Sequence, residues 1–265
     1  MLKISSRDNS KIKFARRVRD GLDADLIFVE GLRLAEEVSR SRLEISDLFF
    51  TENFPRTERG AKFLQAAETS NLAEVSDKVF DSLADTKNSQ GIILLCEKPA
   101  DGRTIIEANL AKTAKIPLLV LLHQINNPSN LGAILRTCEA VDVSGVILTD
   151  HSADAFSPKA LRGAMGASLR LPMWTNADFL GILDWAKTKN ITSICADVKA
   201  GKNYLEVNWQ VPRLLIFGSE AHGLNEKELK EVAENLLIPM ANNVESLNLA
   251  VSAGVILFEA KRQRS

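Results

Sequence analysis

Three polar segments in the second half of the sequence each follow an apolar run that predicts a buried strand. They lie at residues 126–130 (NNPSN), 218–224 (GSEAHGL) and 239–248 (PMANNVESLN). In an open parallel sheet, ligands bind beyond the carboxyl ends of the strands. We therefore expect the three segments, which are rich in Asn, Gly, Ser and Glu, to share one ligand site.

Arg136 is the residue beside these segments that could bind an anion. The helix predicted over residues 130–141 carries an apolar stripe that begins at Leu131, and Arg136 lies outside it. Asn130 stands where this helix should be N-capped. A guanidinium in such a place binds phosphate or carboxylate in a fork. A salt bridge to an acid such as Glu220 is the structural alternative, and the spacing favours neither.

The C-terminal stretch, residues 236–260, combines a strand, a polar turn and a helix. Pro239 ends the strand, and the run 247–258 is apolar almost all round. Such a helix should be buried under other elements or against a second subunit. Ser246 is a candidate N-cap, with a ligand role equally open. Asn248, just inside a buried helix, needs partners. A helix with Ser-x-Asn at its mouth indicates a ligand site.

The elements that must position these residues alternate between strand and helix, which predicts an α/β fold with a doubly wound parallel sheet. Strands are predicted at residues 25–31, 45–51, 71–75, 91–97, 116–123, 144–150, 169–174, 191–197, 213–218 and 236–238. The turn sequence KPADG marks a domain boundary. We expect a small α/β domain at residues 1–100, a linker at 101–115 and a second domain at 116–265.

Composition narrows the class of protein. The chain has 265 residues, of which 45% are hydrophobic and 25% charged, as in ordinary globular proteins. It has no bilayer-length apolar run and no signal-peptide pattern, so a cytoplasmic protein without a membrane partner is expected. The three cysteines lie far apart in apolar runs and should be small buried hydrophobes. The histidines are not spaced as metal ligands, and no phosphate-binding glycine motif follows a strand.

The net charge of −1 gives no support for nucleic-acid binding by bulk electrostatics. The first nineteen residues are nevertheless strongly basic. Their seven cations stand against the single acid Asp8; they are Lys3, Arg7, Lys11, Lys13, Arg16, Arg17 and Arg19. A helix there would suit phosphates, and a plainly solvated surface is the equal alternative.

The segments NNPSNLGAILRTCEA, LLIFGSEAHGL and LLIPMANNVESLNLAVSAGVILFEA resemble three ordered motifs of the SpoU (TrmH) RNA ribose 2′-O-methyltransferases of the SPOUT superfamily. The resemblance covers residues from about 116 to the C-terminus. It implies a deep trefoil knot at the C-terminus, a homodimer through the C-terminal domain, and S-adenosylmethionine bound in the knot. The cofactor contacts that it implies are Gly218, Ile238, Met240 and Leu247.

The family's catalytic residues fall here on Asn130, Arg136, Glu220, Ser246 and Asn248. The resemblance implies that Arg136 assists deprotonation of the ribose 2′-hydroxyl, oriented by Glu220, while Ser246 and Asn248 position nucleotide and cofactor. A guanidinium is a poor base, with a pKa above about 12. A nearby RNA phosphate, or stabilisation of the developing alkoxide, is therefore needed.

The first half of the chain has a fainter resemblance. FVEGLRLAEEV and LADTKNSQGI are similar to the L30e-like RNA substrate-binding domain found in many family members. Ser89 replaces a frequent proline, and Asn242 a frequent glycine of the third motif, and Asn tolerates a positive φ best after Gly. The resemblance implies methylation of ribosomal RNA, with transfer RNA or a non-catalytic knotted RNA-binding module as alternatives.

Overall fold

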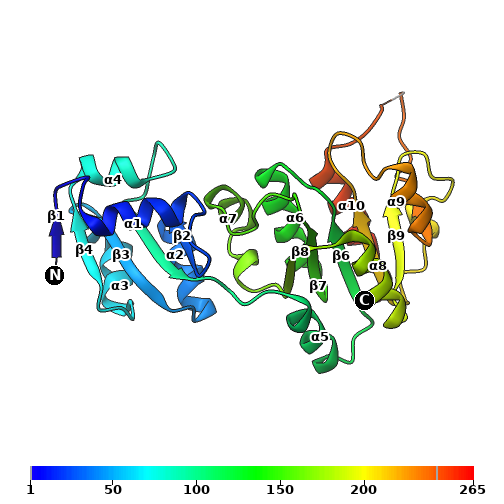
Figure 1. The fold of residues 1–265 in the computed structure, drawn as a ribbon, viewed down its shortest axis with the longest axis horizontal. Helices are drawn as coiled ribbons and strands as arrows, with labels where there is room; N and C mark the ends of the chain where they lie inside the picture. Colours follow the sequence, from blue (N-terminus) through cyan, green and yellow to red (C-terminus); the bar gives the residue numbers. More distant parts are fainter. Residues whose placement is uncertain (1, 243) are drawn as a thin grey trace. The chain divides into compact units, whose positions relative to one another are not determined.

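The computed structural model describes residues 2–242 and 244–265, and its chain divides into two compact units (Figure 1). Met1 and Asn243, the latter within the third polar segment, lie outside the described residues. The first unit is Met1–Pro99 together with Asp154–Arg170, and the second is Ala100–Ala153 together with Leu171–Ser265. These bounds differ from the predicted domains. The expected linker contains helix α5 (Arg103–Lys112), and its residue Ile106 belongs to the core of the second unit.

The first unit contains a mixed five-stranded sheet with the order β1-β4-β3-β5-β2. Its strands are β1 (Leu2–Ile4), β2 (Leu26–Glu30), β3 (Ile45–Thr51), β4 (Leu72–Val75) and β5 (Ile92–Glu97). Its helices are α1 (Ser10–Arg19), α2 (Leu32–Ser41), α3 (Glu58–Ala66), α4 (Asp77–Leu83) and α7 (Pro158–Ala164), with 3-10 helices η1 (Phe54–Arg56) and η2 (Ala167–Leu169). Helix α7 packs against β2, and η2 packs against α2.

The basic N-terminal stretch contains β1 and α1, and several of its cations are bonded within the first unit. Arg7 and Arg19 donate to the backbone oxygens of Lys78 (3.2 Å) and Leu83 (3.1 Å). Arg16 donates to the Ser82 hydroxyl at 2.7 Å. Arg16 and Arg19 hold α1 against α4, and Arg7 binds the segment before α1 to the same helix. This stretch therefore contributes to the packing of the unit itself.

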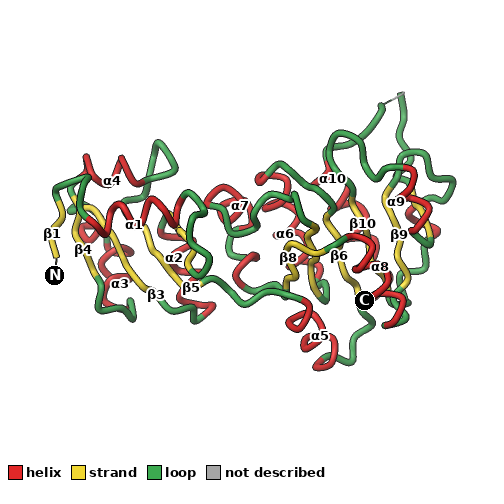
Figure 2. Tube along the Cα trace, viewed as in Figure 1, coloured by secondary structure: helices red, strands yellow, loops and turns green. Residues whose placement is uncertain are grey.

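The second unit contains an entirely parallel sheet (Figure 2), as predicted. The sheet has six strands in the order β11-β9-β10-β6-β7-β8. Its strands are β6 (Leu118–Leu122), β7 (Gly145–Thr149), β8 (Met173–Ala177), β9 (Thr192–Ala196), β10 (Arg213–Phe217) and β11 (Glu234–Leu236). Its further helices are α6 (Pro128–Val141), α8 (Phe179–Thr188), α9 (Glu226–Glu231), α10 (Leu249–Arg264) and the 3-10 helix η3 (Tyr204–Glu206). From β6 the chain continues to β7 on one side, whereas β10 lies on the other. The sheet therefore has its topological switch point between β6 and β10, where such folds bind ligands.

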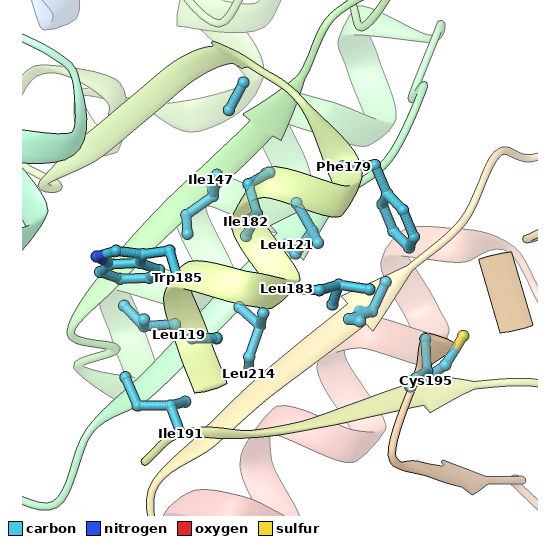
Figure 3. Close-up of a cluster of buried hydrophobic side chains, with 14 of the residues drawn as sticks. Leu119, Leu121, Ile147, Phe179, Ile182, Leu183, Trp185, Ile191, Cys195 and Leu214 are labelled. Atoms are coloured by element: carbon cyan, nitrogen blue, oxygen red, sulfur yellow. The ribbon is translucent and has the colours of Figure 1, made fainter. Parts of the chain in front are cut away.

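Helix α8 covers one face of this sheet (Figure 3). Its buried residues Phe179, Ile182 and Leu183 lie over strand residues such as Leu121 and Ile147. Helices α6 and α10 pack against each other. Because strands buried on both faces need apolar residues at every position, the continuous apolar run of β6 is explained.

Two predicted elements are corrected by the structure. The strand expected at residues 169–174 is β8, Met173–Ala177, and Leu169 instead ends the 3-10 helix η2. Helix α10 is buried on one face only, since Ala253, Ile256 and Leu257 are fully covered whereas Val251 and Phe258 are 52% and 54% exposed. Within the described ranges, no helix has the length and apolar character needed to cross a bilayer.

Candidate active site at the switch point of the parallel sheet

The loops that follow β6 and β10 meet at the switch point through one carboxylate. Because Phe217 pairs with Leu122, the two strands end at the same level. Glu220 then accepts the backbone N–H groups of Asn126 and Asn127 at 3.1 and 3.2 Å. Its Oε1 also accepts the side-chain amide of Asn130 at 3.3 Å. The first and second polar segments therefore form one surface.

Asn248 joins the third polar segment to this surface. Its Nδ2 donates to Oδ1 of Asn130 at 3.1 Å. Its own Oδ1 accepts the backbone N–H groups of Ala250 (2.9 Å) and Val251 (3.3 Å) and so caps α10. The N-cap of α10 is thus Asn248, so the interpretation of Ser246 as the N-cap is wrong, while its role at the ligand site stays a prediction. Ser246 lies exposed in the segment before the helix.

Helix α6 begins earlier than the sequence predicted, and this changes what Asn130 can do. The N-cap is Asn127, whose Oδ1 accepts the N–H of Ser129 at 2.9 Å, and Pro128 occupies the first helical position. Asn130 therefore lies in the first turn and caps nothing. Its half-buried side chain instead bridges Glu220 and Asn248.

Arg136 lies exposed on α6, nearly two turns beyond Asn130. Over residues 2–242 and 244–265, no ion pair joins Arg136 to Glu220, whose carboxylate instead orders the loop after β6. The guanidinium is therefore available to a substrate. Orientation of Arg136 by Glu220 therefore stays a prediction.

Gly218 follows β10 directly and is buried against the chain that returns through residues 223–224. A Cβ there would lie 2.4 Å from the carbonyl carbon of Gly223 and 2.6 Å from the nitrogen of Leu224. Only glycine allows this close approach of two backbone segments. The loop is closed further by a hydrogen bond from the Gly223 N–H to the Ser219 oxygen at 2.9 Å.

The other predicted cofactor contacts lie in the segment after β11. Ile238 and Met240 are half-buried, whereas Leu247 is 37% exposed. Asn242 has a φ of 57°, which confirms that this position needs the left-handed region and that Asn adopts it. Residues 238–242 and 244–248 lie outside helix and strand, so their backbone polar groups are not committed to regular secondary structure.

His123 is a buried residue at this sheet edge that the sequence interpretation did not select. Its Nε2 lies 3.2 Å from the Glu228 carboxylate and its Nδ1 lies 3.2 Å from the Thr149 hydroxyl. Its ring centroid is 4.7 Å from that of Phe179. The position directly after the apolar β6 run was a usable signal, but the partners come from distant elements. His123 connects the ends of β6 and β7 to α9.

The three cysteines are buried and remain thiols. Burial raises the pKa of the Cys96 thiol to about 12, and the pKa of the Cys195 thiol to about 12 with a contribution from Asp197. Burial also raises the pKa of Cys138. In the part of the chain that the structure describes, no three His, Cys, Asp or Glu side chains gather in a way that could hold a metal ion.

Each unit contains a region that matches a known protein family. Residues 117–258 match the SpoU rRNA Methylase family, and residues 9–94 match the MRM3-like substrate binding domain. An uncharacterized tRNA/rRNA methyltransferase of Synechocystis sp. is 34% identical over 190 residues, which are 72% of this chain and 67% of that protein.

Two further similarities extend over nearly the whole chain. The 23S rRNA (guanosine(2553)-2'-O)-methyltransferase RlmP of Bacillus subtilis is 25% identical over 265 residues, covering 98% of this chain and 100% of that protein. The crystal structure of an AdoMet-bound rRNA methyltransferase from Sinorhizobium meliloti has a TM-score of 0.81 and 25% sequence identity, and the match covers 98% of this chain and 97% of that one.

Proposed function

This chain belongs to the SpoU rRNA methylase family, and we propose that its second unit methylates a ribose 2′-hydroxyl of ribosomal RNA at the site around Asn130 and Arg136. S-adenosylmethionine (AdoMet) is the methyl donor, in keeping with the AdoMet-bound relative of the same fold. One observation carries the proposal: hydrogen bonds through Glu220, Asn130 and Asn248 bring three separate segments to a single site at the switch point.

The residues present suit the cofactor. Gly218 provides a backbone surface without a side chain, and the half-buried Ile238 and Met240 can lie against adenine or the methionine chain. When bound, the sulfonium supplies an activated methyl group. The protein must then align the hydroxyl oxygen, the methyl carbon and the sulfur, which is a task of orientation.

Arg136 and the side-chain amides of Asn130 and Asn248 act on the ribose. Asn130 and Asn248 hold the ribose in place from one side of the site. The guanidinium of Arg136 stabilises the oxygen as negative charge develops on it and binds an adjacent RNA phosphate, while the hydroxyl proton is released to solvent water. This division suits a residue whose pKa is too high for it to act as a free base.

Ribosomal RNA is favoured over transfer RNA because RlmP, named for 23S rRNA, aligns with almost the whole chain, including the first unit. We assign reading of the RNA to that unit, which matches a substrate-binding domain. The C-terminal trefoil knot, a cytoplasmic location and a dimer through α10 complete the proposal. The exposed Val251 and Phe258 on α10 support the dimer.

The test uses the purified full-length chain, tritiated S-adenosylmethionine, and 23S rRNA and tRNA from a strain that lacks the gene. We expect label in ribosomal RNA only, at a nucleotide whose 3′ phosphodiester resists alkaline hydrolysis. Label in a base would contradict ribose chemistry, and label in tRNA alone would favour the alternative substrate. Cofactor binding without any transfer would support the non-catalytic module.

A further inference from the structure

The first unit contains a cavity of about 480 Å³ that the methyl-transfer chemistry does not use. It opens between the start of α2, the loop before β5 and the end of α7. Three cationic side chains line it: Arg33, Lys87 and Arg162. Its volume lies in the range of sites that enclose small molecules, roughly 300–1,000 Å³.

The walls of the cavity are held in place by specific contacts. Glu30 is 5% exposed, and its carboxylate accepts the N–H groups of Asp85 (2.7 Å) and Thr86 (3.3 Å) and the Thr86 hydroxyl. Gln90 accepts the N–H of Leu32 through Oε1 at 2.8 Å. The loop at residues 85–90 is therefore fixed against the first turn of α2, and the cavity exists before any ligand arrives.

Gly31 makes the close approach of this loop possible. It has a φ of 98°, and a Cβ there would lie 3.2 Å from the Gln90 side-chain oxygen. As the N-cap of α2 it offers no capping side chain. The N-terminal turn of a ten-residue helix thus faces the cavity, with the partial positive charge that favours anions.

The charges around the cavity leave an excess of cations. The Glu30 carboxylate is already used by the loop, and Asp85 is paired with Nη2 of Arg162 at 2.6 Å. No salt bridge among the described residues involves Arg33 or Lys87, although the bond from Arg59 and, further, the charge of Arg33 lower the pKa of Glu36. Nη1 of Arg162 is buried without a hydrogen-bond partner, and a buried donor of this kind requires an acceptor. An anion in the cavity would supply that acceptor.

The remaining lining is suited to a nucleobase. Leu34 and Met165 give an apolar wall, and the Asn88 amide and the Nε2 group of Gln90 offer hydrogen-bonding groups to a base edge. We infer that this cavity binds one unpaired RNA nucleotide, its phosphate held by Arg33, Lys87 and Arg162. Sequence-specific recognition of RNA commonly uses such extruded bases. RNA as the ligand comes from the proposed function, on which this inference rests.

The segment that supplies Arg162 and Met165 also connects the cavity to the second unit along the chain. It belongs to the first unit, yet in the chain it lies between β7 and β8 of the methyl-transfer sheet. A nucleotide in the cavity therefore contacts residues whose chain continues in both directions into the catalytic unit. The two units are therefore joined by the chain at both ends of this segment, in addition to the connection near residue 100.

RNA binding to the full-length chain, measured in the absence of cofactor, tests the inference. The probe is a fluorescein-labelled, unstructured nine-nucleotide RNA of mixed sequence, followed by anisotropy at several salt concentrations. The pocket variant is Arg33→Ser/Lys87→Ser. The matched control, Arg56→Ser/Lys62→Ser, removes two exposed cations from the same unit outside the cavity. Thermal melting verifies that both variants are folded.

The pocket variant should bind roughly tenfold more weakly, because two charge-assisted hydrogen bonds to phosphate are lost. The slope of log affinity against log salt should flatten by about 0.7, the value for one phosphate contact on a single strand. The control should change affinity less than about twofold, as expected for exposed charges. Equal affinities of the two variants would overturn the inference.

Competition identifies what the cavity binds. A mixture of nucleoside monophosphates should displace the probe from the wild-type chain, whereas inorganic phosphate at the same concentration should not. Equal displacement by phosphate would overturn the base-binding assignment, and equal displacement by an acidic peptide would point to a protein partner instead. Since no methyl transfer is measured, failure of the cavity and failure of the proposed function are distinguishable: a chain that binds through the cavity yet never methylates loses only the latter.

Discussion

Asn130 occupies the position at which three chain segments become one site. Its amide donates to Glu220 and accepts from Asn248 at the same time, which requires a side chain with both a donor and an acceptor. A carboxylate of the same shape cannot donate. At this position the chemistry of the side chain therefore matters more than its size.

Replacement of Asn130 by Asp should lower turnover by about tenfold or more, because a carboxylate would face the Glu220 carboxylate and the donated hydrogen bond would be lost. Ser129→Asp is the matched control, since it adds the same charge to the same helical turn at an exposed position. An acid in the first turn is favourable for a helix, so the control should retain activity and melting temperature. Turnover is measured by steady-state kinetics on the RNA substrate. Equal activity of the two variants would contradict a role for Asn130 in the site.

Arg136→Ala should abolish methyl transfer yet leave the affinity for S-adenosylmethionine nearly unchanged. An interaction made mainly in the transition state appears in turnover and not in ground-state binding. Loss of such a donor typically costs about a hundred- to a thousandfold in rate. Arg136→Lys keeps the charge without the fork. Near-normal turnover of the lysine variant would make Arg136 an electrostatic bystander, and calorimetry with the cofactor gives the binding half of the comparison.

At the scale of elements, strands with continuous apolar runs were predicted within one or two residues, as for β6 and β10. Burial on both faces leaves a plain signal in such strands. The edge strand β8 was misplaced because its half-buried Trp174 and Thr175 and exposed Asn176 do not form an apolar run. Helix α5 was taken for a linker, since of its ten residues only Ile106 is fully buried.

Neither of the two helix caps at the site was predicted correctly: the caps are Asn127 and Asn248, not Asn130 and Ser246. Polar residues stand at several adjacent positions before both α6 and α10, and local pattern does not distinguish among them. Asn127 and Asn248 are the N-caps because the loops after β6 and β11 enter the helices at these residues. The point of entry is set by tertiary structure. The role of Asn130 as a bridge depends on that selection, and so could not be read from the sequence.

Gly218→Ala tests the close approach beneath the second polar segment. The added Cβ would meet the backbone of residues 223–224 at 2.4 Å, so the loop must move. We expect a loss of about 1–3 kcal/mol in unfolding free energy, typical of overpacking, together with weaker cofactor binding. Gly201→Ala is the control, because nothing lies within 4 Å of its Cβ position. Unchanged cofactor affinity in Gly218→Ala would exclude this loop from the cofactor site.

The edge strand β11 gives a prediction about acid. Its Glu234 is bonded to the buried Arg213 at 2.5 Å and to Lys202 at 2.9 Å. Burial opposes the charged form, but the bonds from Arg213 and Lys202 prevail and lower the pKa of Glu234. A lowered pKa means that the stabilisation is present above the ordinary value near 4.5 and is lost as pH falls through the folded-state value.

Glu234→Gln should therefore destabilise the chain at pH 7 by about 1–2 kcal/mol, a figure reduced for the partial exposure of this carboxylate. The difference from wild type should shrink as the pH is lowered below 4.5, since the wild-type carboxylate then becomes protonated. Urea unfolding at a series of pH values measures this. Glu231→Gln, at an exposed position in α9, should show no such dependence, and a constant difference for Glu234→Gln would contradict the assignment.

At the scale of the whole chain, the sequence predicted the boundary between the two units near residue 100 but not the return of a later segment to the first unit. The turn at residues 98–102 predicted the first break, which falls after Pro99. The return of Asp154–Arg170 to the first unit left no sequence signal, because α7 follows β7 as any crossover helix would. Its buried Leu161 belongs to an ordinary apolar stripe. Whether such a stripe packs on its own sheet or on another is decided by long-range contacts.

Helix α10 carries the last prediction, since its exposed face is apolar where a monomer would favour polar residues. Val251 and Phe258 are seven residues apart and therefore project from the same side of the helix, and both are more than half exposed. A second copy of α10 is the partner that we expect to cover them.

Light scattering at micromolar concentration should accordingly give the mass of two chains for the wild type. Phe258→Glu should give the mass of one chain, because a carboxylate cannot be buried unpaired against an apolar surface. Leu180→Glu is the matched control, since Leu180 is 53% exposed on α8, and it should stay dimeric. If the wild type has the mass of one chain, or if both variants dissociate alike, the face of α10 around Phe258 is not the subunit contact.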